Sequence, residues 1–212
     1  FDRNRFRDGH VNYLIAAIKM LYAGYRHEQA RYYYNWLHEN YIPEWKGGVW
    51  DLPLEEFVIA KIAEDGSPIA DLARNQLQAS AVAAYENLAR GNTEAYRAAM
   101  SYAARVYNAH QEGVAERSKL PPLKLMIADA LARVLVRPQI VGTYLDLDAR
   151  HRIWMAQDPE MQRMIYDFIE PALRQQCAQA DPPLGFEKVF PEPPGMEAYR
   201  ARQRQEMAAP PQ

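Results

Sequence analysis

The fold is decided by residues 11–41, VNYLIAAIKMLYAGYRHEQARYYYNWLHENY. Apolar side chains recur every three or four positions from residue 11 to residue 22, which places them on one face of a helix. The same spacing returns from residue 30 to residue 41. Only a short connection around Gly24 separates the two patterns, and a connection of about three residues makes neighbouring helices run antiparallel. This stretch therefore predicts an αα-hairpin.

The ends of the two predicted helices are marked by residues that commonly begin or end a helix. Asp8 precedes the first apolar residue, and its carboxylate can accept hydrogen bonds from backbone N–H groups of the first turn. Gly24 stands near the end of the first helix, where glycine often forms the closing turn. We therefore expect Asp8 to cap the first helix. The second helix has to end before Pro43, because the residue preceding a proline avoids helical dihedral angles.

The second helix also carries two aromatic residues outside its main apolar stripe. At about 100° per residue, Tyr32 and Trp36 point nearly opposite the stripe that contains Ala30, Tyr33 and Leu37. Aromatic residues at helical spacing usually fill a core, so later helices could cover this pair. Alternatively, Tyr32 and Trp36 form an exposed patch that binds a partner.

Helical periodicity continues through most of the remaining chain. The pattern predicts a short helix after Asp51, a long antiparallel pair on either side of Gly91, and further helices beyond the double proline at 121–122. We expect an all-α fold of seven or eight helices, in which antiparallel helical hairpins are stacked as a bundle or a short solenoid, with a Pro-rich C-terminal extension.

Composition divides the chain into five segments. Seven of the 15 prolines lie after residue 180, where no dense apolar stripe is present. Such a segment buries too little surface to offset its ordering entropy, so we expect it to be extended or draped over the body. The predicted segments are a leader or linker (1–10), a helical-hairpin region (11–111), a linker (112–122), a second helical region of the same domain (123–180) and an extended Pro-rich tail (181–212).

Charge and composition exclude some classes of function and leave others open. The chain has 25 Lys and Arg against 27 Asp and Glu, which gives no electrostatic footprint for nucleic acid. No apolar run reaches the roughly 18 residues that a transmembrane helix needs. The single cysteine, Cys177, excludes an internal disulfide and favours a reducing compartment. Because the chain begins with Phe1, we expect it to be part of a longer protein, and an anchor could lie upstream.

Two stretches resemble the tetratricopeptide repeat. In that family a glycine turn is followed by a small residue and then by an aromatic residue, and the two glycine turns of this chain are 67 residues apart, close to twice the roughly 34-residue repeat. The resemblance covers residues 11–43 and 68–110. It rests in the first stretch on Gly24, Ala30, Tyr34 and Leu37, and in the second on Gly91, Ala95, Tyr96, Ala99 and Ala103.

The first hairpin departs from the family pattern, because the spacing from Gly24 to Ala30 is one residue longer than in the family. The resemblance implies a ligand face lined by the first helix of each hairpin. On this chain the residues of such a face are Asn12, Lys19, Tyr22, Gln78 and Tyr85.

Common catalytic and metal-binding motifs are missing from the sequence. It has no phosphate-binding glycine loop, no Gly-x-Ser-x-Gly and no His-Glu-x-x-His. The nearest approach to a metal site is Asp146, Asp148 and His151, of which the last two would share a helix face. The alternative is that Asp146 or Asp148 caps the following helix while His151 lies on its surface. We expect neither a metal nor a cofactor.

These observations favour a non-catalytic helical interaction or scaffold domain. Its partner would be another protein or a second copy of the chain, and Tyr32 and Trp36 are candidate contact residues. The alternative is a helical enzyme or small-ligand-binding domain with a pocket near the loop that contains Trp45 and Trp50. Those tryptophans could equally cap the end of the hydrophobic core.

Overall fold

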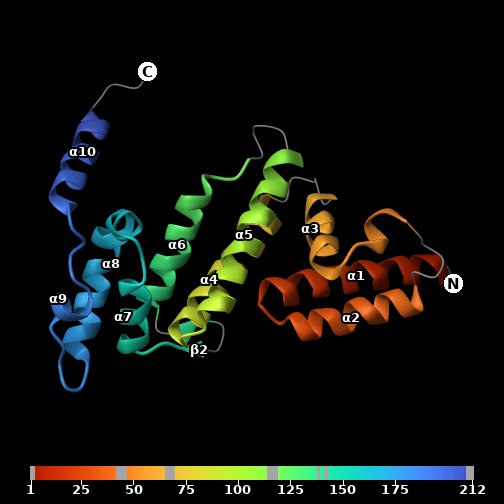
Figure 1. Ribbon diagram of the computed structural model, residues 1–212, viewed down its shortest axis with the longest axis horizontal. Helices are drawn as coiled ribbons and strands as arrows, with labels where there is room; N and C mark the ends of the chain where they lie inside the picture. The colour runs from red at the N-terminus through yellow and green to blue at the C-terminus, as the bar shows by residue number, and fades with distance from the viewer. Residues whose placement is uncertain are drawn as a thin grey trace. The chain divides into compact units, whose positions relative to one another are not determined.

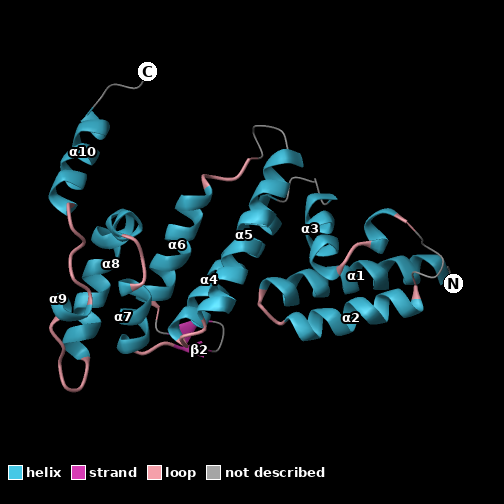
Figure 2. Ribbon diagram, viewed as in Figure 1, coloured by secondary structure: helices cyan, strands magenta, loops and turns pink. Residues whose placement is uncertain are grey.

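A computed structural model describes residues 3–41, 47–64, 70–113, 119–137, 139–140 and 143–208 of the chain. The fold is all-α, as predicted (Figures 1 and 2). Within these ranges it contains ten α-helices, more than the expected seven or eight, together with one short 3₁₀ helix and one two-stranded ribbon. The chain divides into two compact units. One consists of Phe1–Asn87 and Thr93–Ile127, and the other of Leu88–Asn92 and Ala128–Gln212.

The first unit is built on the predicted αα-hairpin. Its elements are α1 (Arg3–Ala23), α2 (His27–Asn40), η2 (Gly48–Asp51), α3 (Leu54–Glu64), most of α4 (Ala70–Ala89), α5 (Thr93–Gly113) and the start of α6 (Leu123–Val136). Helices α1 and α2 lie side by side, and α2 ends before Pro43 as predicted (Figure 1).

The predicted N-terminal cap of α1 is wrong, because the helix begins at Arg3 and Asp8 lies inside it. Tertiary contacts hold these early turns in place. The guanidinium of Arg7 donates to the backbone oxygen of Tyr41 at 3.3 Å, and Nδ1 of His10 lies 2.7 Å from the hydroxyl of Tyr41. The beginning of α1 is thus anchored to the end of α2.

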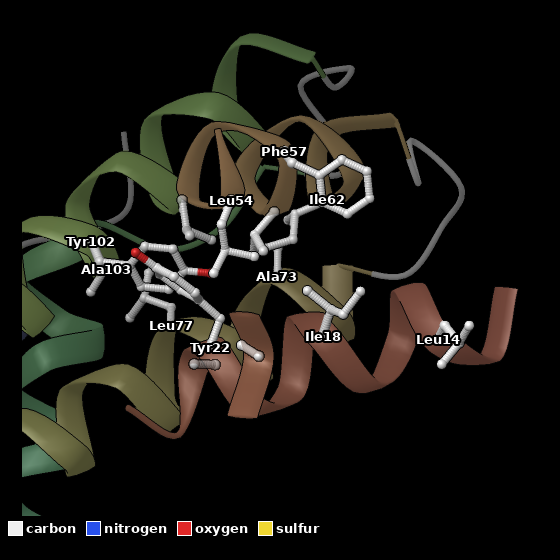
Figure 3. Close-up of a cluster of buried hydrophobic side chains, with 14 of the residues drawn as sticks. Leu14, Ile18, Tyr22, Leu54, Phe57, Ile62, Ala73, Leu77, Tyr102 and Ala103 are labelled. Atoms are coloured by element: carbon white, nitrogen blue, oxygen red, sulfur yellow. The ribbon is translucent and has the colours of Figure 1, made fainter. Parts of the chain in front are cut away.

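Side chains from α1 to α6 contribute to the core of the first unit, and part of this core is drawn in Figure 3. The buried face of α1 is the stripe that the spacing predicts. Figure 3 shows its side chains meeting those of α3, α4 and α5. The labelled residues of this core are Leu14, Ile18, Tyr22, Leu54, Phe57, Ile62, Ala73, Leu77, Tyr102 and Ala103.

The second unit surrounds a buried tryptophan. Its elements are the rest of α6, β1 (Gln139–Ile140), β2 (Thr143–Tyr144), α7 (Leu147–Met155), α8 (Pro159–Gln179), α9 (Phe186–Val189) and α10 (Met196–Ala208). The strands are antiparallel, with Gln139 opposite Tyr144. Trp154 is fully buried, with its ring centroid 6.0 Å from that of Tyr166 and 6.5 Å from that of Phe190.

Helix α8 continues through a proline, a residue that usually bends or breaks a helix. Pro171 lies inside the helix, which runs without a break to Gln179. The buried side chains of Ile169 and Leu173 stand on either side of Pro171 and belong to the same face. Proline has no backbone N–H, so one helical hydrogen bond is missing here. Burial of both side chains stabilises the helix at this position.

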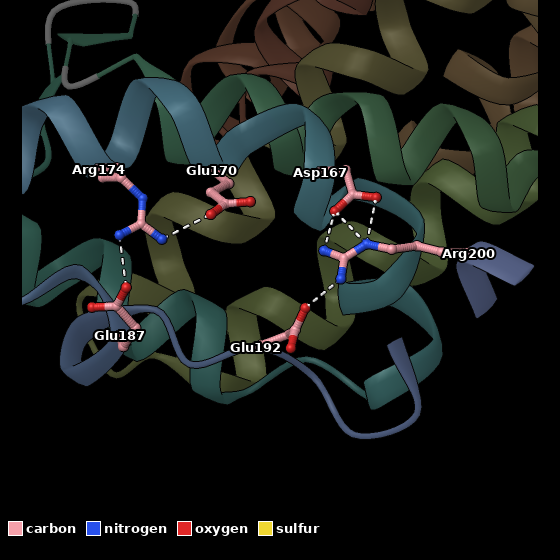
Figure 4. Close-up of polar contacts among 6 residues, drawn as sticks. All are labelled: Asp167, Glu170, Arg174, Glu187, Glu192 and Arg200. Carbon is pink, nitrogen blue, oxygen red and sulfur yellow. Dashed lines mark hydrogen bonds and ion pairs between the residues drawn. The ribbon is translucent and has the colours of Figure 1, made fainter. Parts of the chain in front are cut away.

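The segment after residue 180, expected to be extended or draped over the body, contains two helices, α9 and α10. A few widely spaced apolar residues hold it, namely the buried side chains of Phe186, Phe190 and Met196. Two arginines add ion pairs, of which Arg174 with Glu187 and Arg200 with Asp167 join this segment to α8 (Figure 4). Arg174 pairs with Glu170 and Glu187, and Arg200 pairs with Asp167 and Glu192.

Candidate functional site

A groove of about 460 Å³ lies along the α1–α2 hairpin. Apolar and aromatic side chains make up most of its walls, and several of them are exposed. The exposed fraction is 70% for Tyr13, 69% for Met20, 64% for Tyr32 and 39% for Tyr33. We call this surface the tyrosine groove. Its lining residues are Tyr13, Leu14, Ala17, Met20, Leu21, Arg26, Gln29, Tyr32 and Tyr33.

The tyrosine groove arises because each helix of the hairpin is apolar on more than one side. On α1, Tyr13, Ala17 and Met20 form a second stripe at spacings of four and three residues, beside the buried stripe. On α2, Tyr32 and Tyr33 place their rings edge to face, with centroids 5.3 Å apart. The core of the unit covers only the first side of the hairpin, so the second side stays exposed.

Tyr32 and Trp36, predicted to act as one pair, have different environments. Tyr32 is exposed and lines the groove, whereas Trp36 is half-buried against the core. The ring of Trp36 lies 5.5 Å from that of His10 and 5.6 Å from that of Tyr41. Tyr32 therefore fits the alternative of an exposed patch, and Trp36 fits the alternative of an aromatic residue that packs against the core.

The ligand face implied by the tetratricopeptide resemblance is not assembled as an exposed surface. Lys19, Tyr22 and Tyr85 are buried, with exposed fractions of 5%, 8% and 1%, and Gln78 is half-buried. Only Asn12 is exposed. The three buried side chains belong to the inner faces of α1 and α4, so they cannot contact a partner in the folded unit.

Sequence reasoning missed most residues of the tyrosine groove. Tyr13, Met20, Arg26, Gln29 and Tyr33 were not predicted to bind a partner. The i, i+4, i+7 spacing of Tyr13, Ala17 and Met20 carries a signal, because a second apolar stripe on one helix has to be covered or exposed.

A cluster of ionisable side chains lies between the hairpin, α3 and α5; Tyr22 and Tyr102 are buried, His27 and Glu55 are half-buried and Arg105 is exposed. The Tyr22 ring lies 4.9 Å from that of Tyr102 and is stacked on His27 at 4.3 Å. Tyr22 also donates a hydrogen bond to Glu55, which pairs with Arg105 at 2.6 Å. Burial raises the pKa of both tyrosines far above its usual range and lowers the pKa of His27. All three groups are therefore neutral at neutral pH.

The residues of the candidate metal site have other roles. Oδ1 of Asp146 accepts a hydrogen bond from the backbone N–H of Ala149 at 2.7 Å, so it caps α7. Nδ1 of His151 lies 2.5 Å from the backbone oxygen of Val189 and donates to it. In the part of the chain that the structure describes, no three His, Cys, Asp or Glu side chains come together as a metal site. The capping alternative for Asp146 is confirmed.

Each unit also contains at least one further cavity. A cavity of about 350 Å³ is lined by Trp50 and Lys61 with four residues of α1. Nζ of Lys61 lies 4.2 Å from the centre of the Trp50 ring, whereas Trp45 is outside the described residues. Another cavity, about 480 Å³, lies beside the start of α7. There the buried Arg150 donates to the backbone oxygen of Leu135 at the end of α6.

None of the described helices combines the length and the apolar character required to cross a membrane. Comparison with protein-family models, with curated proteins and with solved structures found no match to this chain.

Proposed function

We propose that the chain is a non-catalytic interaction domain that binds a partner protein through the tyrosine groove. The observation that supports this proposal is the exposure of four large apolar side chains, Tyr13, Met20, Tyr32 and Tyr33, along one groove of a single hairpin. Contiguous exposed apolar surface on a folded domain commonly marks a binding site.

The size of this surface suits a protein interface. Covering the exposed parts of the four side chains would bury on the order of 400 Å², about half of what one partner contributes to a standard interface. Tyrosine is also enriched among residues that dominate binding energy, because it combines a large apolar ring with a hydroxyl that can form hydrogen bonds.

Site-specific photo-crosslinking in cells tests the proposal. A benzophenone amino acid replaces Tyr32 in one variant and Phe168, a comparably exposed aromatic residue of α8, in the control variant. We expect the variant at position 32 to form an adduct with one protein, which is identified by mass spectrometry. That protein, once purified, should bind the wild-type chain and lose affinity for Tyr13→Ser. Absence of an adduct, or the same adducts from both positions, would contradict the proposal.

A second candidate function is binding of a small ligand in the cavity beside Trp50. Its volume of about 350 Å³ and its mixed lining of Trp50, Lys61 and Asn12 favour this candidate, since small-molecule sites combine apolar walls with a few polar groups. A fragment screen by NMR tests it. Binders should shift resonances of these residues in the wild-type chain and fail to do so in Lys61→Met.

A further inference from the structure

We infer that the element bound in the tyrosine groove is a short amphipathic helix of a different protein, which places a carboxylate against Arg26. This inference rests on the proposed function, because it specifies the partner of the same surface.

The dimensions of the groove match a helix. The exposed stripe of α1 in the groove runs from Tyr13 to Met20, a separation of seven positions, or about 10 Å at 1.5 Å per residue. Apolar side chains at positions i and i+7 of a bound helix are separated by the same distance. Helices that bind in grooves are anchored by residues at i, i+3, i+4 and i+7. Two turns of an amphipathic helix would therefore fill the groove.

The walls of the groove favour a helix over an extended peptide. Both walls are helices, α1 and α2, whose backbone groups already hydrogen-bond within each helix. A bound strand would find no sheet edge here, so its N–H and C=O groups would lose water without gaining partners. A helix satisfies its own backbone and presents only side chains.

Charge specifies the chemistry of the partner. Arg26 is the only charged residue among the nine that line the groove, and it is exposed. Within the described residues its guanidinium has no ion-pair partner. A carboxylate placed beside it at the edge of an apolar surface would form a charge-assisted hydrogen bond and fix the direction of the helix. Because α1 and α2 are antiparallel, Arg26 stands at the turn end of the groove and Tyr13 at the other end.

The same charge argues against a second copy of this chain. A twofold interface brings the same surface of both copies together, so each groove would face another Arg26 and no carboxylate of the groove. The occupant that complements the surface is therefore a different chain with an acidic residue at one end of its apolar stripe.

A displayed library of 16-residue helical peptides tests this inference. Leucine is fixed at i, i+3, i+4 and i+7, and the other positions are random. The full chain is used for selection as wild type, as Arg26→Glu and as the control Arg204→Glu, which changes an exposed arginine of α10. We expect Asp or Glu at one end of the stripe with wild type and control, and Lys or Arg at the same position with Arg26→Glu.

Affinities of a selected peptide give the quantitative result. The acidic peptide should bind Arg26→Glu at least about 10-fold more weakly than wild type, and its Glu→Lys version should recover that loss. Tyr32→Ser should abolish selection. Peptides without a charge preference, or insensitive to Tyr32→Ser, would overturn the inference.

Failure of the inference and failure of the proposed function can be told apart. If light scattering shows a dimer that Tyr32→Ser dissociates, the occupant is a second copy, and the helix inference fails while the groove remains a binding surface. The same holds if a photo-crosslinked partner is found but no helical peptide is selected. If position 32 forms no adduct in cells, the proposed function itself fails.

Discussion

Tyr25 occupies the left-handed position of the turn between α1 and α2, with φ of +58°, although the neighbouring residue is a glycine. Gly24 itself has no positive φ. The turn is closed by the backbone N–H of Arg26, which donates to the oxygen of Leu21 at 2.9 Å. The Tyr25 ring packs on His27 with centroids 4.4 Å apart. These contacts hold Tyr25 in a left-handed backbone conformation that glycine adopts more easily.

Alanine should therefore be tolerated at one glycine and not at another. A Cβ on Gly24 would lie 3.4 Å from its nearest neighbour, an ordinary contact, so we expect Gly24→Ala to stabilise the protein by up to about 1 kcal/mol. At Gly91 the space is open but φ is +78°, so Gly91→Ala should cost about 1–2 kcal/mol. Urea unfolding of both variants measures the difference. Equal effects at both positions would contradict it.

The two aromatic residues of α2 should respond differently to truncation. Tyr32→Ser removes an exposed side chain, so we expect a change within about 0.5 kcal/mol in the free energy of unfolding. Trp36→Ser removes packing against His10 and Tyr41, and should cost about 2 kcal/mol, roughly half the cost of truncating a fully buried tryptophan. Thermal unfolding of the two variants checks this. A large loss for Tyr32→Ser would show that the groove is part of the core.

At the scale of single elements, α2 combines a stable buried edge with an exposed aromatic one. Ala30 and Leu37 are fully buried, and Tyr34 donates from its hydroxyl to the backbone oxygen of Leu52. The exposed side chains of the tyrosine groove and the buried side chains of the core therefore lie on different faces of α2.

Two histidines of α2 make stability depend on pH. Burial lowers the pKa of both His27 and His38 in the folded chain, so the unfolded chain takes up protons more readily below pH 6.5. Stability should be constant above that pH and should fall as the pH decreases through the lowered folded-state pKa values. We expect His27→Gln and His38→Gln each to flatten this decrease, as measured by urea unfolding between pH 7 and pH 5. If the free energy of unfolding depends on pH in both variants as it does in the wild type, the assignment of this dependence to the two histidines is contradicted.

At the scale of the whole molecule, the chain forms two units, each with its own buried aromatic centre. The division falls within α6, between Ile127 and Ala128, and Leu88–Asn92 at the end of α4 also belongs to the second unit. In the second unit the C-terminal segment completes the core, since Nε1 of Trp154 donates to the backbone oxygen of Pro191 at 3.3 Å. The segment has few apolar residues, but burial of Phe186 and Phe190 stabilises its attachment to the unit.

Attachment of this segment should depend on its buried aromatic residues more than on its ion pairs. Phe190→Ala should cost about 3–5 kcal/mol, because it leaves a cavity beside Trp154. The Arg200 pairs are exposed, so Arg200→Ala should change stability by less than about 1 kcal/mol. Tryptophan fluorescence during urea unfolding reports on both. A larger loss for Arg200→Ala would show that the ion pairs hold the segment.

The all-α class and the main helices follow from the sequence alone, because apolar spacing acts within a few positions of the chain and capping residues mark some of the ends. The stripe from Val11 to Tyr22 is buried as its spacing predicts, and Asp158 caps α8 by accepting hydrogen bonds from two backbone N–H groups at 2.9 Å. These features need no knowledge of what packs against them.

Only the tertiary structure decided which apolar faces are covered. Tyr32 and Trp36 have the same spacing signal, yet one is exposed in a groove and the other packs against His10 and Tyr41. Lys19 and Tyr85, which could have lined a ligand face, lie inside the unit. Periodicity fixes the direction of a side chain around its own helix axis, but its exposure depends on residues distant in sequence that meet it only in the folded chain.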